Sequence, residues 1–285
     1  MNDVYSPLVE VRGLVKRYGD KTVLDGIDLV IERGETIVLI GGSGSGKSTL
    51  ARILVGLESP TSGEILVEGM PLHSMGRRAL RAARARFGMV FQKHALLDSL
   101  TVFDNVAFPL REHEDLDANE TDARVMAALE ELGVAAAAHK LPGELSGGMA
   151  KRVAIARATV HEPEILVYDE PTSGLDPISS RTVDGLIERM REHHFVTSIV
   201  ITHDMLTAYD VADRVVLLAG GRLLVDGPPE VVFRSHDNDI QPFAVSSGLD
   251  LSALGARAAR KTAAEIRALW QMRAGAGGDA PPIAV

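Results

Sequence analysis

Continuous apolar runs separated by amphipathic segments dominate the central and later parts of this sequence. A run without polar alternation predicts a strand that is buried on both faces of a sheet. Such strands are predicted at Thr36–Ile40, Ile165–Asp169, Thr197–Thr202 and Arg214–Leu218. Helices are predicted between these strands, at Lys47 to about Leu57, at about Ile178 to His193, and after His203. The alternation of strand and helix predicts an α/β core with a largely parallel sheet.

The beginning of the chain has a different pattern. Val9–Val15 and Thr22–Ile31 are predicted strands that a turn at residues 18–21 joins. Residues 62–69 predict a further turn and strand.

A third pattern lies in the middle of the chain, from about Leu100 to Ala158. Apolar side chains recur there at helical spacing, as at Val125, Leu129 and Leu132. Residues 112–122 are acidic and are expected to form a solvated loop or the edge of a helix. The segment is therefore predicted to be a helical subdomain inserted into the α/β core.

Composition limits the class of protein. The 285 residues are 46% hydrophobic, which predicts one large core with an appendage. The 30 Lys and Arg against 39 Asp and Glu give a formal charge of -9, which argues against nonspecific binding of duplex nucleic acid. Cysteine is absent, which suits a reducing compartment. The first residues lack signal-peptide features and the apolar runs are shorter than the roughly 20 residues that span a bilayer, so any membrane association is expected to be peripheral.

A glycine-rich loop follows the first buried strand and precedes a predicted helix. The pattern Gly41-x4-Gly46-Lys47-Ser48, in this strand–loop–helix context, predicts a phosphate-binding loop rather than a turn without a ligand. Its backbone N–H groups converge on phosphate oxygens, and the helix N-terminus attracts their charge. Lys47 is expected to contact the β- and γ-phosphates of a nucleotide, and Ser48 to hold Mg²⁺. Nucleotide contacts are predicted for Gly41, Ser43, Gly44, Ser45, Gly46, Lys47, Ser48 and Thr49.

Two adjacent carboxylates end the buried strand at residues 165–169. Asp169 is expected to emerge at the C-terminal edge of the sheet, beside the glycine-rich loop, and to order Mg²⁺ through water. Glu170 follows it and is predicted to act as the general base that polarises an attacking water molecule. An Asp-Glu pair at a strand end is often only a helix cap. Here it precedes the string Pro171–Asp176, which favours the catalytic interpretation.

A third string, Leu145-Ser146-Gly147-Gly148-Met149, precedes a predicted helix at residues 149–159. By itself it reads as a helix N-cap. In this order with the glycine-rich loop and ILVYDE at residues 165–170, it resembles the ATPase subunits of ABC transporters, from about Leu8 to Ser235. The resemblance implies a P-loop NTPase (ABC ATPase) core with a parallel sheet, an antiparallel β subdomain and an inserted helical subdomain at about residues 100–158.

The resemblance also implies a homodimer that binds ATP and Mg²⁺ and hydrolyses ATP. In this family the LSGGQ-type string of one protomer caps the ATP that the other protomer's phosphate-binding loop holds. This role is carried over to Ser146, Gly147 and Gly148. Met149 stands where the family usually has Gln, but the hydroxyl, the backbone N–H groups and the helix dipole that meet the γ-phosphate are unaffected. Catalysis is therefore expected to require dimerisation.

Four further positions match the family singly. Tyr18 matches the aromatic residue that stacks on adenine, although a tyrosine packed in a turn is the plain alternative. Gln92 matches the glutamine that reaches Mg²⁺ and the attacking water, and His203 the histidine that contacts the γ-phosphate and the catalytic glutamate. Asp176 matches the aspartate that crosses the dimer interface. The predicted catalytic residues are thus Glu170, His203, Gln92 and Lys47, and the predicted metal ligands Ser48, Gln92 and Asp169.

A narrower resemblance is carried by residues 91–113 and by LSGGMAKRVAIARA from Leu145 onward. Both are similar to the ATPase of Mla-type, MCE-linked phospholipid transport systems, and Met149 fits that subgroup. Ser173–Asp176 instead follows the general ABC pattern. The resemblance implies lipid transport between the membranes of Gram-negative bacteria and a position at the cytoplasmic face of the inner membrane. The partners it implies are an integral membrane permease, an MCE-domain substrate-binding protein and a small accessory subunit, with no nucleic acid.

Other functions remain as alternatives. One alternative is the ATPase subunit of an importer for amino acids or another small solute. The motifs of the cassette barely distinguish this function from lipid transport. A P-loop kinase would not need LSGGM or His203. A soluble ABC ATPase acting on nucleic acid usually has two cassettes or coiled-coil, zinc or basic insertions, which this sequence lacks. The arginines at 77, 78, 81, 84 and 86 are expected to form a solvated helix face rather than a nucleic-acid site.

The predicted ABC ATPase domain covers residues 8–240. Residues 241–285 are predicted to be a C-terminal extension that is partly helical and ends in a disordered segment. One apolar face at residues 251–272 suggests a helix that packs on a partner subunit. That face contains Leu251, Leu254, Ala258, Ile266, Leu269 and Met272.

Overall fold

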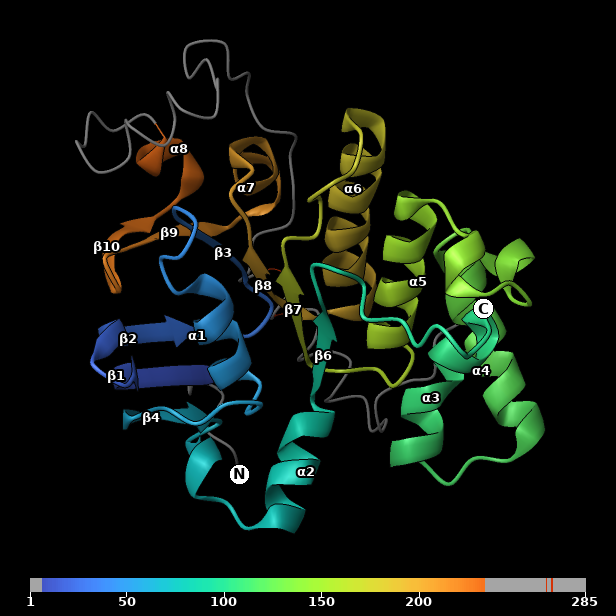
Figure 1. Ribbon diagram of the computed structural model, residues 1–285, viewed down its shortest axis with the longest axis horizontal. Coiled ribbons are helices and arrows are strands. Elements are labelled where there is room, and N and C mark those ends of the chain that lie inside the picture. Colours follow the sequence, from blue (N-terminus) through green and yellow to red (C-terminus); the bar gives the residue numbers. More distant parts are fainter. Residues whose placement is uncertain (1–6, 234–264, 266–267, 269–285) are drawn as a thin grey trace.

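Two β-sheets and a group of helices form the part of the chain that the computed structural model describes, residues 7–233, 265 and 268 (Figure 1). Apart from the exposed helical residues Glu265 and Ala268, the predicted C-terminal extension at 241–285 lies outside the described residues. Within the described part, none of the helices combines the length and the apolarity that crossing a bilayer requires.

The larger sheet contains six strands. Its strands are β3 (Thr36–Ile40), β6 (Phe87–Val90), β7 (Ile165–Asp169), β8 (Thr197–Ile201), β9 (Arg214–Ala219) and β10 (Arg222–Gly227). Their order is β10-β9-β3-β8-β7-β6, with all neighbours parallel except the antiparallel pair β9 and β10. The predicted parallel α/β core is therefore confirmed.

The edge strands β6 and β10 were not predicted, for two different reasons. β6 has four residues and one of them is Gly88, so it lacks a long apolar run. A Cβ atom at Gly88 would lie 2.2 Å from the carbonyl oxygen of Ala158, so only glycine allows this close approach. β10 alternates between exposed and half-buried positions, as expected for an edge strand with one face toward solvent.

Strands β3, β7 and β8 of the large sheet are buried on both faces, as their unalternated apolar runs predicted. In β3, Ile37 and Leu39 point into one hydrophobic core, whereas Val38 and Ile40 point into the other. All four side chains are fully buried, and burying a side chain of this size contributes roughly 1.5–3 kcal/mol. Two cores, one on each side of a single sheet, therefore fix the position of the strand that leads into the glycine-rich loop.

The core that contains Ile37 and Leu39 is covered by a second, antiparallel sheet and a short helix. The sheet has the order β2-β1-β4-β5 and consists of β1 (Val9–Tyr18), β2 (Lys21–Ile31), β4 (Ser62–Val67) and β5 (Met70–Pro71). Helix α1 (Lys47–Leu54) packs against this sheet and the large one through Leu50, Ile53 and Leu54. α1 ends at Leu54 and not near Leu57 as predicted, because Gly56 adopts φ 71° and closes the helix.

The second core is covered by helices, which Figure 1 shows grouped beyond the β6 edge and over one face of the sheet. The predicted helical subdomain comprises α3 (Val102–His113), α4 (Ala118–Glu131) and α5 (Gly147–Thr159). The remaining helices are α2 (Arg77–Ala85), α6 (Pro177–His194), α7 (Met205–Val211) and α8 (Pro229–Val232), with 3₁₀ turns at Leu72–Ser74, Ala135–Ala137 and Pro142–Glu144. The acidic stretch at 112–122 is only partly a loop, because Asp117 and Glu120 form a capping box that starts α4.

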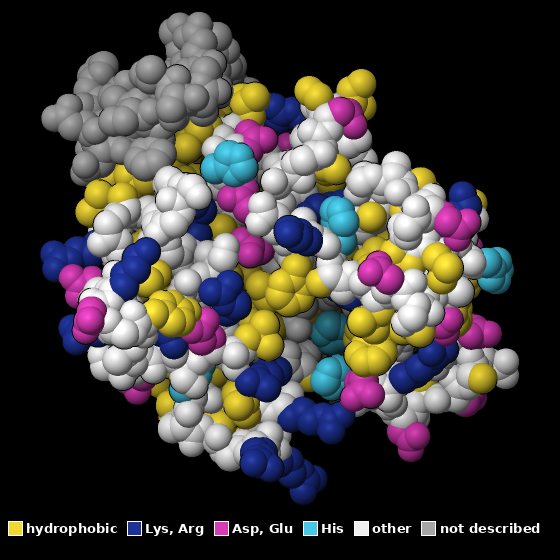
Figure 2. All heavy atoms as spheres, in the orientation of Figure 1, with side chains coloured by type: hydrophobic (Ala, Val, Ile, Leu, Met, Phe, Trp, Pro, Cys, Tyr) yellow, Lys and Arg dark blue, Asp and Glu magenta, His cyan; other side chains and the backbone are white. Residues whose placement is uncertain are grey.

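The arginine-rich segment forms helix α2 and agrees with the predicted solvated face. Figure 2 shows Lys and Arg side chains gathered at the lower end of the molecule, where Figure 1 places α2. Arg86, at the end of this helix, instead pairs with Glu164 at 2.7 Å and with Glu68 at 3.0 Å. The exposed members are Arg77, Arg78, Arg81 and Arg84.

Asn105 connects the helical subdomain to the loop that enters it, and its replacement gives a stability prediction. Its buried amide donates to the carbonyls of Leu97 (3.1 Å), Leu100 (3.1 Å) and Thr101 (2.9 Å), and Oδ1 accepts from the Leu97 N–H at 2.7 Å. We expect Asn105→Ala to lower the free energy of unfolding by about 2 kcal/mol, since buried backbone groups lose their partner. Urea denaturation measures the change, with Asn119→Ala at an exposed position as the control. Equal stability of the two variants would contradict the prediction.

Candidate functional site

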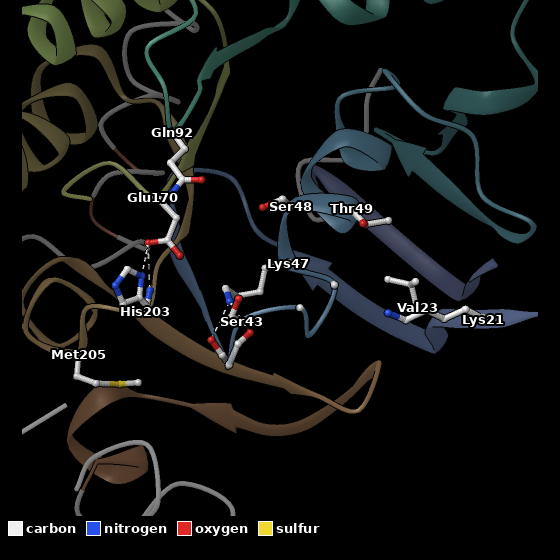
Figure 3. A pocket seen from close by; sticks show the side chains of 14 residues that line it. Lys21, Val23, Ser43, Lys47, Ser48, Thr49, Gln92, Glu170, His203 and Met205 are labelled. Atoms are coloured by element: carbon white, nitrogen blue, oxygen red, sulfur yellow. Dashed lines mark hydrogen bonds and ion pairs between the residues drawn. The ribbon is translucent and has the colours of Figure 1, made fainter. Parts of the chain in front are cut away.

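A pocket of about 650 Å³ opens at the C-terminal ends of the parallel strands β3, β6, β7 and β8 (Figure 3). This is the edge of an open α/β sheet where ligands usually bind. The pocket brings together residues that the sequence separates by up to 184 positions, from Lys21 to Met205. The predicted site residues that line it are Gly41, Ser43, Gly44, Gly46, Lys47, Ser48, Thr49, Gln92, Glu170 and His203.

The glycine-rich loop forms one wall of the pocket. Gly46 has φ 107°, a conformation that favours glycine, and a Cβ atom there would lie 2.8 Å from Cδ2 of Leu24 and 3.0 Å from the carbonyl oxygen of Val23. The loop is thus pressed against strand β2, and α1 begins directly after it. The Ser45 hydroxyl is buried in the loop without a hydrogen-bond partner among the described residues. The loop has the backbone geometry that a phosphate cradle requires.

Lys47 lies inside this loop with its ammonium group bound to main-chain oxygens. Nζ donates to the carbonyls of Gly41 at 2.7 Å and Gly42 at 3.0 Å. Burial lowers the pKa of Lys47, while the carboxylates of Glu170 and Asp169 act in the opposite direction. A phosphate in the pocket would offer charged oxygens in place of neutral carbonyls, and such charge-assisted bonds are stronger.

Two of the three residues predicted to hold the metal, Ser48 and Asp169, are in direct contact. The Ser48 hydroxyl donates to Oδ1 of Asp169 at 3.0 Å. A hydroxyl and a carboxylate side by side, next to a phosphate-binding loop, fit Mg²⁺, which prefers oxygen ligands and is usually bound by one or two protein groups with phosphates and water. Gln92 lines the same pocket from the segment after β6, and its Nε2 lies 3.5 Å from Oγ of Ser173.

Glu170 is held in an unusual conformation. It follows the last residue of β7 with φ 52°, a left-handed value that costs energy for a residue with a side chain. Its backbone N–H donates to the Ile201 carbonyl at 2.8 Å, so the neighbouring strand fixes it. Glu170 therefore has a strained backbone in the pocket, and the surrounding residues determine the direction of its carboxylate.

His203 orients this carboxylate, as Figure 3 shows. With its proton on Nδ1, the imidazole donates to Oε2 of Glu170 at 2.8 Å, and the His203 backbone N–H reaches the same oxygen at 3.3 Å. The Glu170 side chain is 11% exposed, whereas that of His203 is 67% exposed. A buried carboxylate at the edge of the pocket, held by an accessible histidine, can accept a proton from a water molecule there.

Four other predicted nucleotide contacts lie elsewhere and form a second surface. Ser146 caps α5, with Oγ accepting from the Met149 N–H at 3.3 Å, and Asp176 caps α6, with Oδ1 accepting from two N–H groups at 3.0 Å. A Cβ atom at Gly148 would lie 3.3 Å from Oγ of Ser179, so the beginnings of α5 and α6 are adjacent. None of Ser146, Gly147, Gly148 and Asp176 lines the pocket.

Tyr18 is also outside the pocket lining. The side chain is largely exposed; its hydroxyl donates to Glu58, and Nζ of Lys16 lies 4.9 Å from the ring centroid. Lys21 and Val23, which follow it on β2, line the pocket instead. Stacking of Tyr18 on adenine stays a prediction.

The sequence analysis missed four pocket residues, Lys21, Val23, Gly42 and Met205. Residues 21 and 23 are two apart on a strand and thus on one face, so strand periodicity beside the loop could have found them. Gly42 is inside the phosphate-binding pattern at a position that the pattern leaves free. Met205 begins α7, just beyond His203, and only its place in the fold brings it to the pocket.

Lys151 was missed as well and lies behind the pocket. The side chain is fully buried, and Nζ donates to the carbonyl oxygens of Gln92 at 3.1 Å, Phe91 at 3.4 Å and Glu170 at 3.4 Å. Burial lowers the pKa of Lys151 to about 8, against the attraction of the Asp169 and Glu170 carboxylates. A lysine within an apolar helical pattern gives no sequence signal for such a position.

Comparisons of the sequence and of the fold with known proteins both indicate the same family. The family described as ABC transporter matches residues 24–173. The intermembrane phospholipid transport system ATP-binding protein MlaF of Haemophilus influenzae is 39% identical over 236 residues, which cover 83% of this chain and 89% of that protein. The methionine import ATP-binding protein MetN of Mesorhizobium japonicum is 40% identical over 238 residues, 84% of this chain and 65% of that protein.

Among solved structures, the chain is similar to the ATP-binding cassette MJ0796 in a dimeric post-hydrolysis state bound to ADP and Pi. The TM-score is 0.72 at 30% identity, and the match covers 78% of this chain and 98% of that chain. The family match, the relatives and the shared fold agree with the three strings that the sequence carries and with the pocket where two of them meet. This chain belongs to the ABC transporter family, as one of its ATP-hydrolysing subunits.

Proposed function

We propose that this protein powers phospholipid transport between bacterial membranes. It acts as a homodimer bound to an integral membrane permease at the cytoplasmic face of the inner membrane, with an MCE-domain substrate-binding protein and a small accessory subunit as further partners. Residues 8–240 form its ATPase domain. The lipid assignment is supported by the similarity to MlaF of Haemophilus influenzae, whose name describes intermembrane phospholipid transport.

The dimer is supported by one observation above all, the division of the predicted site residues between two surfaces. Lys47, Gln92, Glu170 and His203 share the pocket, whereas Ser146 lies at the second surface with the start of α6. A cap on that surface reaches a γ-phosphate only when the phosphate belongs to another copy of the chain. Two copies related by a twofold axis satisfy this condition for both pockets at once.

The proposed chemistry assigns one task to each predicted catalytic residue and metal ligand. Lys47 and the N–H groups of the loop bind the phosphates, and Glu170 accepts a proton from water as the water oxygen attacks the γ-phosphorus and the bond to the ADP oxygen breaks. His203 keeps the Glu170 carboxylate in place. Ser48, Gln92 and Asp169 would hold Mg²⁺, which neutralises phosphate charge when bound.

A second function is import of a small solute. It is favoured by MetN of Mesorhizobium japonicum, a methionine import protein by name, which is as similar to this chain as MlaF is. The pocket does not separate the two functions, because its residues face a nucleotide and not the transported molecule. The partner proteins therefore decide between them.

Co-purification from membranes tests the proposed function. The full chain, tagged and expressed in its own host, is extracted with mild detergent, and the proteins bound to it are identified by mass spectrometry. We expect a permease and an MCE-domain protein, together with bound phospholipid. A periplasmic solute-binding protein in place of the MCE-domain protein would contradict the lipid assignment. An untagged chain carried through the same steps identifies proteins that bind the resin alone.

A further inference from the structure

Burying a lysine completely costs free energy, because its charge loses the water that solvates it. Lys151 nevertheless has none of its surface exposed, and its three acceptors are all main-chain carbonyl oxygens. An ammonium group has three N–H donors, so the three carbonyls account for all of them. Among the described residues, this set of contacts fixes backbone positions and binds no side chain.

The backbones that Lys151 holds belong to the catalytic pocket. Gln92 and Glu170 both line it, and Phe91 precedes Gln92. Glu170 is the residue with φ 52°, which needs support from its surroundings to keep that conformation. Its N–H is bound by Ile201 and its carboxylate by His203, and Lys151 supplies the contact on its carbonyl.

Lys151 also connects these backbones to the beginning of helix α5. Lys151 lies four residues after Gly147, the first residue of α5, and Ser146 is the cap of the same helix. At a rise of 1.5 Å per residue this separation is about 6 Å along a hydrogen-bonded helix. Because the helix moves as one body, a displacement of Ser146 displaces Lys151 with it.

We propose that Lys151 is a positioning residue that ties the backbones of Gln92 and Glu170 to helix α5, so that docking of Ser146 on the partner's nucleotide sets the geometry of hydrolysis in the protomer's own pocket. The inference rests on the dimer under the proposed function. It assigns to Lys151 a role in coupling the two nucleotide sites, through a single rigid helix.

The first test compares three variants in ATPase assays on the assembled transporter. Lys151→Met keeps the length of the apolar chain and removes all donors, so we expect kcat about tenfold lower with KM for ATP changed by less than about twofold. Lys151→Gln keeps two donors and is expected to lose only about threefold in kcat. Arg152→Met is the matched control. Arg152 is next on the same helix and donates to the carbonyls of Gly133 (3.1 Å), Leu132 (3.3 Å) and, at the cap end of α5, Gly148 (3.4 Å), but to no carbonyl of a pocket residue.

The outcomes separate positioning from stability. Melting temperatures are measured for all variants, and a kcat loss in Lys151→Met that Arg152→Met does not share at a similar melting temperature supports the inference. A kcat within about twofold of wild type in Lys151→Met, or equal losses in both methionine variants, would overturn it. If Lys151→Met does not fold, Lys151→Gln decides, and a wild-type kcat in that variant overturns the inference.

A second test locates the effect within the dimer. Heterodimers are prepared with Glu170→Gln in one protomer, so that hydrolysis occurs only in the pocket of the other, and Lys151→Met is placed on either protomer. We expect the loss only when Lys151→Met shares a protomer with the active pocket, because Lys151 acts on its own Gln92 and Glu170. An equal loss from the protomer that donates only the Ser146 cap would show that Lys151 acts through the cap, and would overturn the inference. Full hydrolysis by a monomer would instead contradict the proposed dimer.

Discussion

Glu170→Gln is expected to bind ATP and to hydrolyse it at least about a hundredfold more slowly than the wild-type protein. Glutamine has the shape of glutamate and can keep the contact of the side chain with the His203 backbone N–H, now at 3.3 Å. It cannot accept a proton from water at neutral pH. The loss is therefore chemical and leaves the phosphate-binding loop intact.

Two measurements on the same preparation check this expectation. Phosphate release gives the rate of hydrolysis, and nucleotide affinity shows whether ATP still binds. ATP bound without turnover should also trap the dimer, which size-exclusion chromatography in MgATP detects. Glu130→Gln, an exposed substitution on α4, controls for the charge change. Wild-type turnover in Glu170→Gln would refute the assignment of Glu170 as the base.

Lys47→Ala is expected to fail at an earlier step. Its ammonium is the group that we propose to meet the phosphates, and in the structure it binds the Gly41 and Gly42 carbonyls of the loop. Two charge-assisted hydrogen bonds, each worth about 1.5–3 kcal/mol, correspond to an affinity loss of about a hundredfold or more. The variant should therefore lose measurable ATP binding, and its hydrolysis with it.

Nucleotide affinity by calorimetry and phosphate release measure the effect of Lys47→Ala. Lys140→Ala removes an equal charge at an exposed position and is the control. Unchanged affinity and rate in Lys47→Ala would contradict the phosphate-cradle assignment. The comparison with Glu170→Gln is also informative, because one variant is expected to lose binding and the other only turnover.

Segments that are determined by nearby residues could be predicted from the sequence. Thr36–Ile40 is a strand because four of its five side chains are apolar and consecutive, and the run shows no preference for one face. Gly46 permits the left-handed turn that starts α1, and Asp176 and Ser146 supply the hydrogen bonds that start α6 and α5. These features need only the chemistry of adjacent positions.

Other features were missed because their cause is distant in the chain. Gly88 permits a close approach to Ala158, seventy positions away, so its strand was not recognised. Residues 112–122, predicted to be a solvated loop or the edge of a helix, contain both, because the capping box of Asp117 and Glu120 starts α4 within them. The base-stacking role of Tyr18 stays a prediction, since the described contacts of this side chain are with Glu58 and Lys16, outside the pocket lining.

The sequence by itself determined which groups of atoms are present: a phosphate-binding loop, an Asp-Glu pair at a strand end and a serine-glycine helix cap. Tertiary structure alone decided which of them face the same space. It placed Gln92, Glu170 and His203 around the loop, kept Ser146 and Asp176 on another surface, and buried Lys151 beneath Gln92 and Glu170. The physical reason is that backbone hydrogen bonding and side-chain periodicity act over a few residues, whereas distances across the fold are set by how the two cores pack against one sheet.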